Sequence, residues 1–255
     1  MQNLKAAFLV ALMLSVLAFT ASASYTVQNL NVTLTLKPNT SAQVNEVLRV
    51  LVSNASVSQY SMNRLAFNLT LSDWQKLLGP MLVQHIINSN ESLYNFKLFP
   101  GPITTQAGQS AAYVIMTYTV PNVTFVNQTS PRQFLYSFNP KVLNFNHGVS
   151  GEVLIENTTL TITVPQGATI ETAYPLPDLP PYASLSNYKN LSSVSWVYGE
   201  PLSKFSFTFL MQQSIQGEVA SFFRSVYNIF GIFSYVIIAA AVLLFIIYTY
   251  YRASK

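Results

Sequence analysis

The chain has 255 residues, no cysteine and only 9% charged residues, with a formal net charge of +4. The lack of cysteine excludes disulfides, thiol catalysis and thiolate metal sites. Between the two apolar ends of the chain, lysines and arginines nearly balance the carboxylates. This part of the sequence has no basic patch, so a nucleic-acid partner is not predicted.

Residues 1–23 have the features of a secretory signal peptide. Lys5 precedes an apolar run from Ala6 to Phe19, and the small residues Ala21 and Ala23 mark a cleavage site. A short basic start, an apolar stretch and a small-x-small site define this class of segment. We expect cleavage after Ala23 or one residue later, with an uncleaved anchor as the alternative. Either way, the following residues are predicted to lie outside the cell.

The next segment, residues 24–210, is predicted to be a mainly β ectodomain. In its first strand, from Val27, the apolar residues Leu30, Val32, Leu34 and Leu36 alternate with polar ones, which indicates one buried face. Further strands are predicted at about 42–52, 62–71, 94–99, 111–120, 133–138, 151–155, 159–164, 194–198 and 204–210. Short strands separated by proline and glycine turns favour an antiparallel, immunoglobulin-like β-sandwich. Two smaller sandwiches with a boundary near residues 128–131 are the alternative.

A helical insertion is predicted at about residues 72–88. Ser72 and Gln75 have the spacing of a capping box, and apolar residues from Trp74 to His85 follow at helical spacing. Gly79 and Pro80 interrupt this pattern, so two short helices are expected rather than one.

Nine Asn-x-Ser/Thr sequons lie between the signal and the C-terminal apolar stretch. This pattern marks acceptor sites for N-glycans in exported proteins. Because charged side chains are few, glycans would supply much of the hydration of the surface. The candidate glycosylation sites are Asn31, Asn39, Asn54, Asn68, Asn90, Asn122, Asn127, Asn157 and Asn190.

The C-terminal region is predicted to cross a membrane once. Residues 226–251 carry no charge, are long enough to span a bilayer as a helix and have aromatic residues at both ends. Residues 211–225 are predicted to form a helical stalk, either continuous with the span or lying in the headgroups. An apolar stripe on it could also be a self-association seam. The tail, residues 252–255, has two positive charges, which favours the cytoplasmic side.

No pattern in the sequence predicts catalysis, a cofactor or a metal. The two histidines are interpreted as a core histidine, His85, and a turn histidine, His147. Two histidines without cysteine are a poor set of metal ligands unless carboxylates complete it. The serine-hydrolase elbow and the phosphate-binding glycine loop are missing. Two of the nine carboxylates could in principle form the catalytic pair of a glycosidase, but no spacing in the sequence points to such a pair. The chain is therefore predicted not to be an enzyme.

The whole layout resembles uncharacterised exported surface glycoproteins of archaea that have one C-terminal transmembrane helix. The features are the signal AFLVALMLSVLAFTASA, nine sequons, no cysteine, low charge and the span VIIAAAVLLFIIYTYY. The resemblance is compositional and implies no functional residue.

The predicted function is that of a non-catalytic, single-pass cell-surface glycoprotein with a role in envelope structure, adhesion or protein binding. The alternative is an accessory or ligand-binding subunit of a membrane complex, docked through the stalk and the span. The expected partners are membrane lipid and an envelope or membrane protein, and nucleic acid is not expected.

Overall fold

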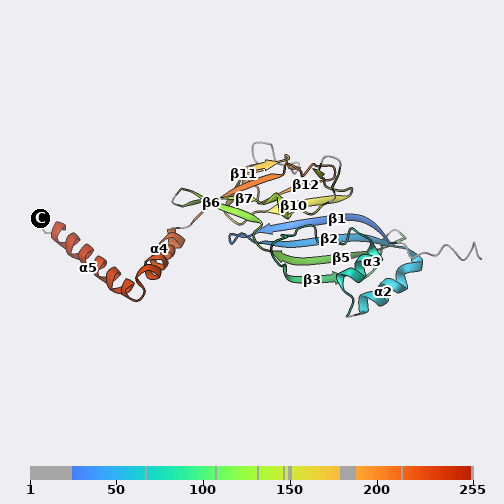
Figure 1. The fold of residues 1–255 in the computed structure, drawn as a ribbon, viewed down its shortest axis with the longest axis horizontal. Coiled ribbons are helices and arrows are strands. Elements are labelled where there is room, and N and C mark those ends of the chain that lie inside the picture. The colour runs from blue at the N-terminus through green and yellow to red at the C-terminus, as the bar shows by residue number, and fades with distance from the viewer. Residues whose placement is uncertain are drawn as a thin grey trace, which may run out of the picture. The chain divides into compact units, whose positions relative to one another are not determined.

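The computed structural model describes residues 25–66, 68–106, 108–130, 132–145, 147–148, 151–178, 188–213 and 215–253. The predicted signal peptide lies outside these residues. The chain divides into two compact units, one of residues 1–126 with 136–210 and one of residues 127–135 with 211–255. The described part is mainly β, as predicted, with two sheets rich in antiparallel pairs (Figure 1).

The larger sheet has seven strands in the order β12-β10-β1-β2-β5-β3, with β4 also paired to β5. All its described pairs are antiparallel except β1 with β10, which are parallel. A parallel pair needs a long connection, and β1 and β10 are separated in sequence by most of the other strands. The strands are β1 (Tyr25–Leu36), β2 (Ala42–Val52), β3 (Tyr94–Pro100), β4 (Thr104–Gln106), β5 (Gln109–Val120), β10 (Thr158–Thr163) and β12 (Ser193–Trp196).

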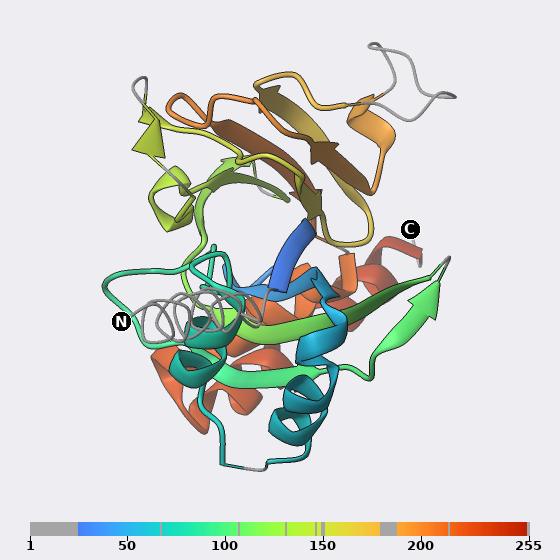
Figure 2. The same cartoon turned by 90° about the vertical axis from the view of Figure 1, so that its right-hand side faces the viewer.

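The smaller sheet has four strands in the order β11-β13-β7-β6. A separate two-stranded hairpin, β8 with β9, replaces most of the strand predicted at 151–155. Strands β10 to β13, coloured yellow to orange, lie together in Figure 2. The strands are β6 (Thr124–Ser130), β7 (Gln133–Phe138), β8 (His147–Gly148), β9 (Gly151–Glu152), β11 (Ala168–Tyr174) and β13 (Ser206–Gln212).

Alternating apolar residues build the core of the β domain. In β1, Leu30, Val32 and Leu34 are fully buried, which confirms the predicted parity of that strand. Trp196 of β12 packs edge-on against Phe207 of β13, with ring centroids 6.1 Å apart, so an aromatic contact joins the two sheets. Fully burying one such side chain contributes about 1.5–3 kcal/mol.

The prediction of a strand at 62–71 is wrong, because residues up to Leu65 belong to helix α2 (Val57–Leu65). A 3-10 turn, η1 (Asn54–Ser56), leads into this helix. Tyr60 anchors this helix: its ring lies 5.4 Å from that of Trp74, and its hydroxyl donates to the carbonyl of Gly101 at 3.1 Å. Leu65, predicted to face the core, is 66% exposed. Packing around Tyr60 therefore overrides the local period of two.

A helix forms in the predicted insertion, but it is a single helix and its N-cap differs from the predicted one. Helix α3 spans Leu71–Leu78, and its N-cap is Thr70, not Ser72. Thr70 and Asp73 form a reciprocal capping box, in which each side chain accepts from the other residue's backbone N–H. Gly79, with φ +94°, ends the helix. The second predicted helix is replaced by irregular chain from residue 79 to 88.

The C-terminal region contains two helices, α4 (Ile215–Phe230) and α5 (Phe233–Ala253). Helix α5 includes the one described segment, residues 233–252, that is long and apolar enough to cross a membrane, with a mean hydropathy of 2.2. The long apolar helix therefore starts seven residues later than predicted. The stalk continuous with the span is not formed, because Gly231 and Ile232 separate the two helices.

Candidate functional site

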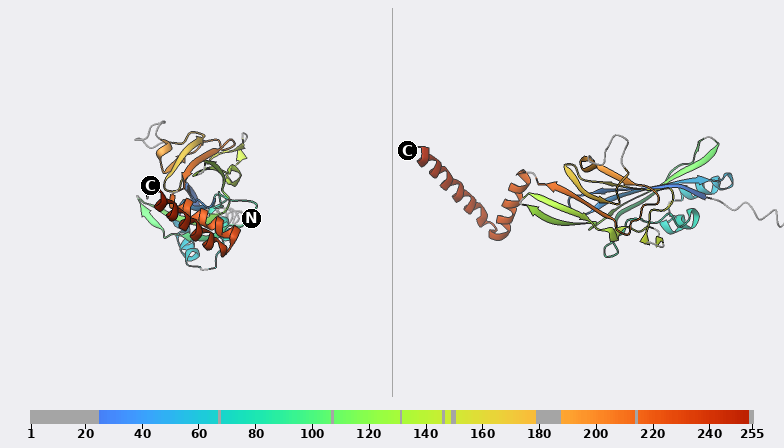
Figure 3. Two further views of the ribbon diagram at one scale, coloured as in Figure 1. Left: turned by 90° about the vertical axis from the view of Figure 1, so that its left-hand side faces the viewer. Right: turned by 90° about the horizontal axis from the view of Figure 1, so that it is seen from above.

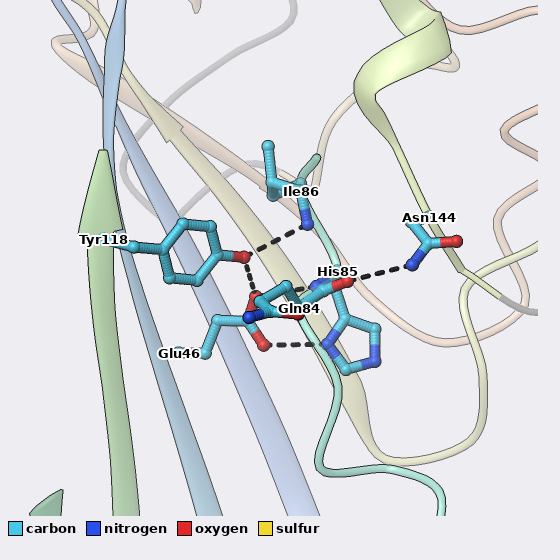
Figure 4. Close-up of polar contacts among 6 residues, drawn as sticks. All are labelled: Glu46, Gln84, His85, Ile86, Tyr118 and Asn144. Carbon is cyan, nitrogen blue, oxygen red and sulfur yellow. Dashed lines mark hydrogen bonds and ion pairs between the residues drawn. The ribbon is translucent and has the colours of Figure 1, made fainter. Parts of the chain in front are cut away.

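A buried cluster of three polar side chains is the most unusual feature of the β domain. Glu46 lies on β2, Tyr118 on the neighbouring β5, and His85 on the irregular segment 79–88 (Figure 4). Oε2 of Glu46 lies 2.8 Å from Nδ1 of His85, and Oε1 accepts the His85 backbone N–H at 2.8 Å. The Tyr118 hydroxyl donates to the same Oε1 atom. One carboxylate thus joins two strands to a loop.

All three side chains are buried: Glu46 and Tyr118 are 0% exposed and His85 is 3% exposed. A buried carboxylate is tolerated only when hydrogen bonds and a partner charge replace its hydration. The three donors around Glu46 meet that need. Nδ1 of His85 donates to Oε2 in the tautomer that carries its proton on that nitrogen. Burial, and then the charge of Glu46, raise the pKa of Tyr118 far above its ordinary value of 10.

Neighbouring backbone groups hold the loop in place around this cluster. The Ile86 N–H donates to the Tyr118 hydroxyl at 3.2 Å. Asn144 donates from Nδ2 to the carbonyl of Gln84 at 2.9 Å and from its backbone N–H to that of His85 at 2.8 Å. The ring of Phe145 lies 5.1 Å from the imidazole of His85. Segments near residues 46, 85, 118 and 144 are thereby fastened together.

A histidine beside a carboxylate and a tyrosine has the composition of an acid–base site. A substrate must, however, come within hydrogen-bond reach of the acid or base. The burial of all three side chains blocks that approach. A pocket of about 270 Å³ lies elsewhere, lined by residues that include Leu51, Asn54 and Gln109. The geometry therefore favours a structural fastening over catalysis.

The sequence carried a partial signal for this cluster. Glu46 shares its strand parity with Val44, Leu48 and Val50, so the sequence places an acid on an apolar face. His85 is buried, as expected of a core histidine, although not on a helix. Tyr118 was not singled out. His147 lies in β8 rather than in a free turn. Within the described residues, no group of three or more His, Asp or Glu could hold a metal.

All nine sequon asparagines are exposed. Asn31 lies within β1, Asn127 within β6, Asn54 in η1 and Asn190 in the 3-10 turn η3 (Tyr188–Asn190), and the other five lie in turns or loops. The remaining five are Asn39, Asn68, Asn90, Asn122 and Asn157.

Asn122 is one of the sequon asparagines whose side chain is hydrogen-bonded. It accepts from the Thr40 hydroxyl at 3.1 Å, and its Nδ2 donates to Oε1 of Glu91 at 2.5 Å. Nδ2 is the atom to which an N-glycan would be joined, and it has a second hydrogen to lose. The arrangement therefore remains compatible with modification.

The outer face of the larger sheet carries two rows of uncharged polar side chains. Each row crosses β12, β10, β1, β2 and β5 in register. Every member is exposed or half-buried. Such a face can be hydrated through hydroxyls and amides alone. The rows consist of Ser193, Thr163, Thr35, Gln43 and Thr119, and of Ser195, Thr161, Thr33, Asn45 and Thr117.

Comparison with known proteins gives this chain no family. No protein-family model matches it, and no curated protein matches it. The properties that bear on function are therefore those of the molecule itself: a mainly β fold, a sealed polar cluster, exposed sequons and one long apolar helix.

Proposed function

We propose that the protein is a non-catalytic, single-pass cell-surface glycoprotein. Its β domain lies outside the cell, its C-terminus in the cytoplasm, and its role is envelope structure, adhesion or protein binding. The observation that carries this proposal is the exposure of all nine sequon asparagines in a β domain that precedes a long apolar helix. A chain selected for glycosylation needs its acceptor asparagines at the surface.

Two further observations support a binding role without chemistry. The Glu46–His85–Tyr118 cluster is sealed from solvent. The two outer rows of hydroxyls and amides offer hydrogen bonds but no charge, which suits an uncharged polar partner surface better than nucleic acid. The finer fold assignment, an immunoglobulin-like sandwich, also belongs to this proposal. The aromatic contact between the sheets supports it, whereas the parallel β1–β10 pair departs from it.

The accessory-subunit alternative is favoured by one specific observation. Helix α4 has large apolar side chains in the open, among them Phe222 at 62% and Ile229 at 71% exposed. Exposed apolar patches mark interaction sites. In this alternative, a membrane protein partner would cover them.

The test is to isolate the full-length protein from native membranes in mild detergent. Peptide mass spectrometry should find glycan on several of the nine asparagines, and removing the glycans should lower the intact mass accordingly. Changing a glycosylated sequon asparagine to Gln should remove one increment of mass. The matched change Asn29→Gln should remove none, because Asn29 lies on β1 beside the sequon asparagine Asn31 but outside any sequon.

The same preparation separates the two functions. A stoichiometric membrane partner that is lost when residues 226–251 are exchanged for an unrelated apolar helix would favour the accessory subunit. Nine unmodified asparagines would overturn the glycoprotein proposal.

A further inference from the structure

Helix α4 ends at a defined break before the apolar helix α5. Gly231 has φ +56° and donates its N–H to the carbonyl of Tyr227 at 2.7 Å, which closes the last turn of α4. The N–H and hydroxyl of Ser234 both donate to the carbonyl of Gly231, at 3.1 and 2.7 Å. Figure 3 shows α4 and α5 as two separate rods. The two helices therefore have different axes.

The two helices also differ in how their apolar residues are distributed. Helix α5 is apolar on all sides, and only 6% of its spanning window is buried within the protein. Helix α4 carries a single apolar stripe, and Arg224 and Asn228 fall on the opposite side at helical spacing. The stripe consists of Val219, Phe222, Phe223, Val226, Ile229 and Phe230.

The stripe is open in the described chain. Its members Val219, Phe222, Phe223, Ile229 and Phe230 are between 43% and 71% exposed. Leaving such side chains in water forgoes the free energy that the burial of each one would contribute. A cover for this stripe is therefore expected.

The short link between α4 and α5 indicates what covers the apolar stripe of α4. Only Gly231 and Ile232 separate the helices, so the end of α4 lies at the level where α5 enters the bilayer. The rings of Tyr227 and Tyr235 meet across the junction, with centroids 6.1 Å apart. Tyrosine is enriched at this depth, because its ring prefers the acyl boundary and its hydroxyl prefers the headgroups.

We propose that α4 lies in the plane of the membrane interface, with its apolar stripe on the acyl chains and its polar side towards water. One-sided amphipathic helices bind membranes in this way. The inference rests on the proposed function, since it requires α5 to span the bilayer. It also assigns to lipid the surface that the accessory-subunit alternative would give to a protein.

The test uses the full chain, whose lack of cysteine allows single-cysteine labelling without background. Val226→Cys places a fluorescent label on the stripe, and Asn228→Cys places one on the opposite, polar side within the same turn. Leu244→Cys reports on the middle of α5. The labelled proteins are reconstituted in phosphatidylcholine vesicles. Quenching is then measured with brominated lipid and with aqueous iodide.

We expect labels at 226 and 244 to be quenched by brominated lipid and the label at 228 by iodide. Iodide quenching at 226, with 244 still in lipid, would place α4 in water and overturn the inference alone. Protection of 226 from both quenchers would mean that a second copy or another protein covers the stripe, which also overturns it. Iodide quenching at 244 would instead overturn the proposed span. A second pair, Val219→Cys and Arg224→Cys, repeats the comparison if either first variant misfolds.

Discussion

Glu46 is the residue on which the arrangement of the loop 79–88 depends most directly. Its two oxygens form hydrogen bonds with the backbone N–H and the ring Nδ1 of His85 and with the hydroxyl of Tyr118. Substituting Leu would leave three buried donors without an acceptor. Substituting Gln keeps the shape, but its amide nitrogen cannot accept a hydrogen bond.

We predict that Glu46→Gln lowers the free energy of unfolding by about 3 kcal/mol, because breaking one side of a buried pair leaves the other side unsatisfied. Urea unfolding followed by the fluorescence of the two tryptophans measures this. The matched change Glu156→Gln, at an exposed position, should cost less than about 0.5 kcal/mol. In a double-mutant cycle, Glu46→Gln and Tyr118→Phe should not be additive. Equal losses for Glu46→Gln and Glu156→Gln would contradict the fastening role.

Buried tyrosines predict an alkaline limit to stability. Burial raises the pKa of Tyr60 to about 12, and it raises the pKa of Tyr118 further still. A group whose pKa is higher in the folded state stabilises fully below its unfolded value of about 10 and loses that contribution as pH rises towards the folded value. The free energy of unfolding should therefore be insensitive to these groups at neutral pH and fall from pH 10 to 12.

Tyr60 alone should account for a loss of about 3 kcal/mol across that window, from its shift of roughly two pKa units. Urea unfolding at pH 8, 10 and 11.5 would show the slope. Tyr60→Phe should reduce the slope and leave the part due to Tyr118, although the lost hydrogen bond to Gly101 lowers stability at every pH. Tyr198→Phe, at a position that is 62% exposed, should leave the slope unchanged. An unchanged slope in Tyr60→Phe would assign the alkaline loss to other groups.

At the level of elements, the strands were more predictable than the helices. Strands β1 and β5 have one face in the core and one towards solvent, so the period of two is written into their residues. Helix α2 offered no such signal, because a single buried ring, that of Tyr60, fixes it. Met62 and Leu65, which follow Tyr60 in the helix, are both 66% exposed.

The candidate cluster was out of reach of local reasoning for a different reason. Its members come from positions 46, 85 and 118, and the pairing of β2 with β5 brings the first and last together. Periodicity reports which face a residue occupies, but not which residue stands beside it on the next strand. An acid at an apolar parity, as at Glu46, is the one local sign that such a partner exists.

At the level of the whole molecule, solubility and anchoring are assigned to different parts of the chain. The ectodomain has few charges, and its exposed sequons and uncharged polar rows are the groups available for hydration. The apolar surface is concentrated in α4 and α5. Removing these helices should therefore free the ectodomain from lipid without opening its core.

We predict that a chain ending at Gln213 is secreted, soluble without detergent and folded, with a melting temperature within a few degrees of that of the full-length protein. The buried aromatic residues Trp196, Phe207 and Phe209 all precede this point. Gln213 also keeps its bonds to Arg132, whose Nε and Nη2 donate to the Gln213 carbonyl at 3.3 and 3.0 Å. Calorimetry and size-exclusion chromatography provide the measurement.

A chain ending at Leu210 is the matched control. It lacks the last residues of β13 and the acceptor for Arg132, so it should melt several degrees lower, since about 1 kcal/mol shifts the melting point of a domain of this size by roughly 2–4 °C. Aggregation of the chain ending at Gln213 would mean that α4 and α5 complete the ectodomain. Their exposed stripe would then be a protein-binding surface rather than a lipid-binding one.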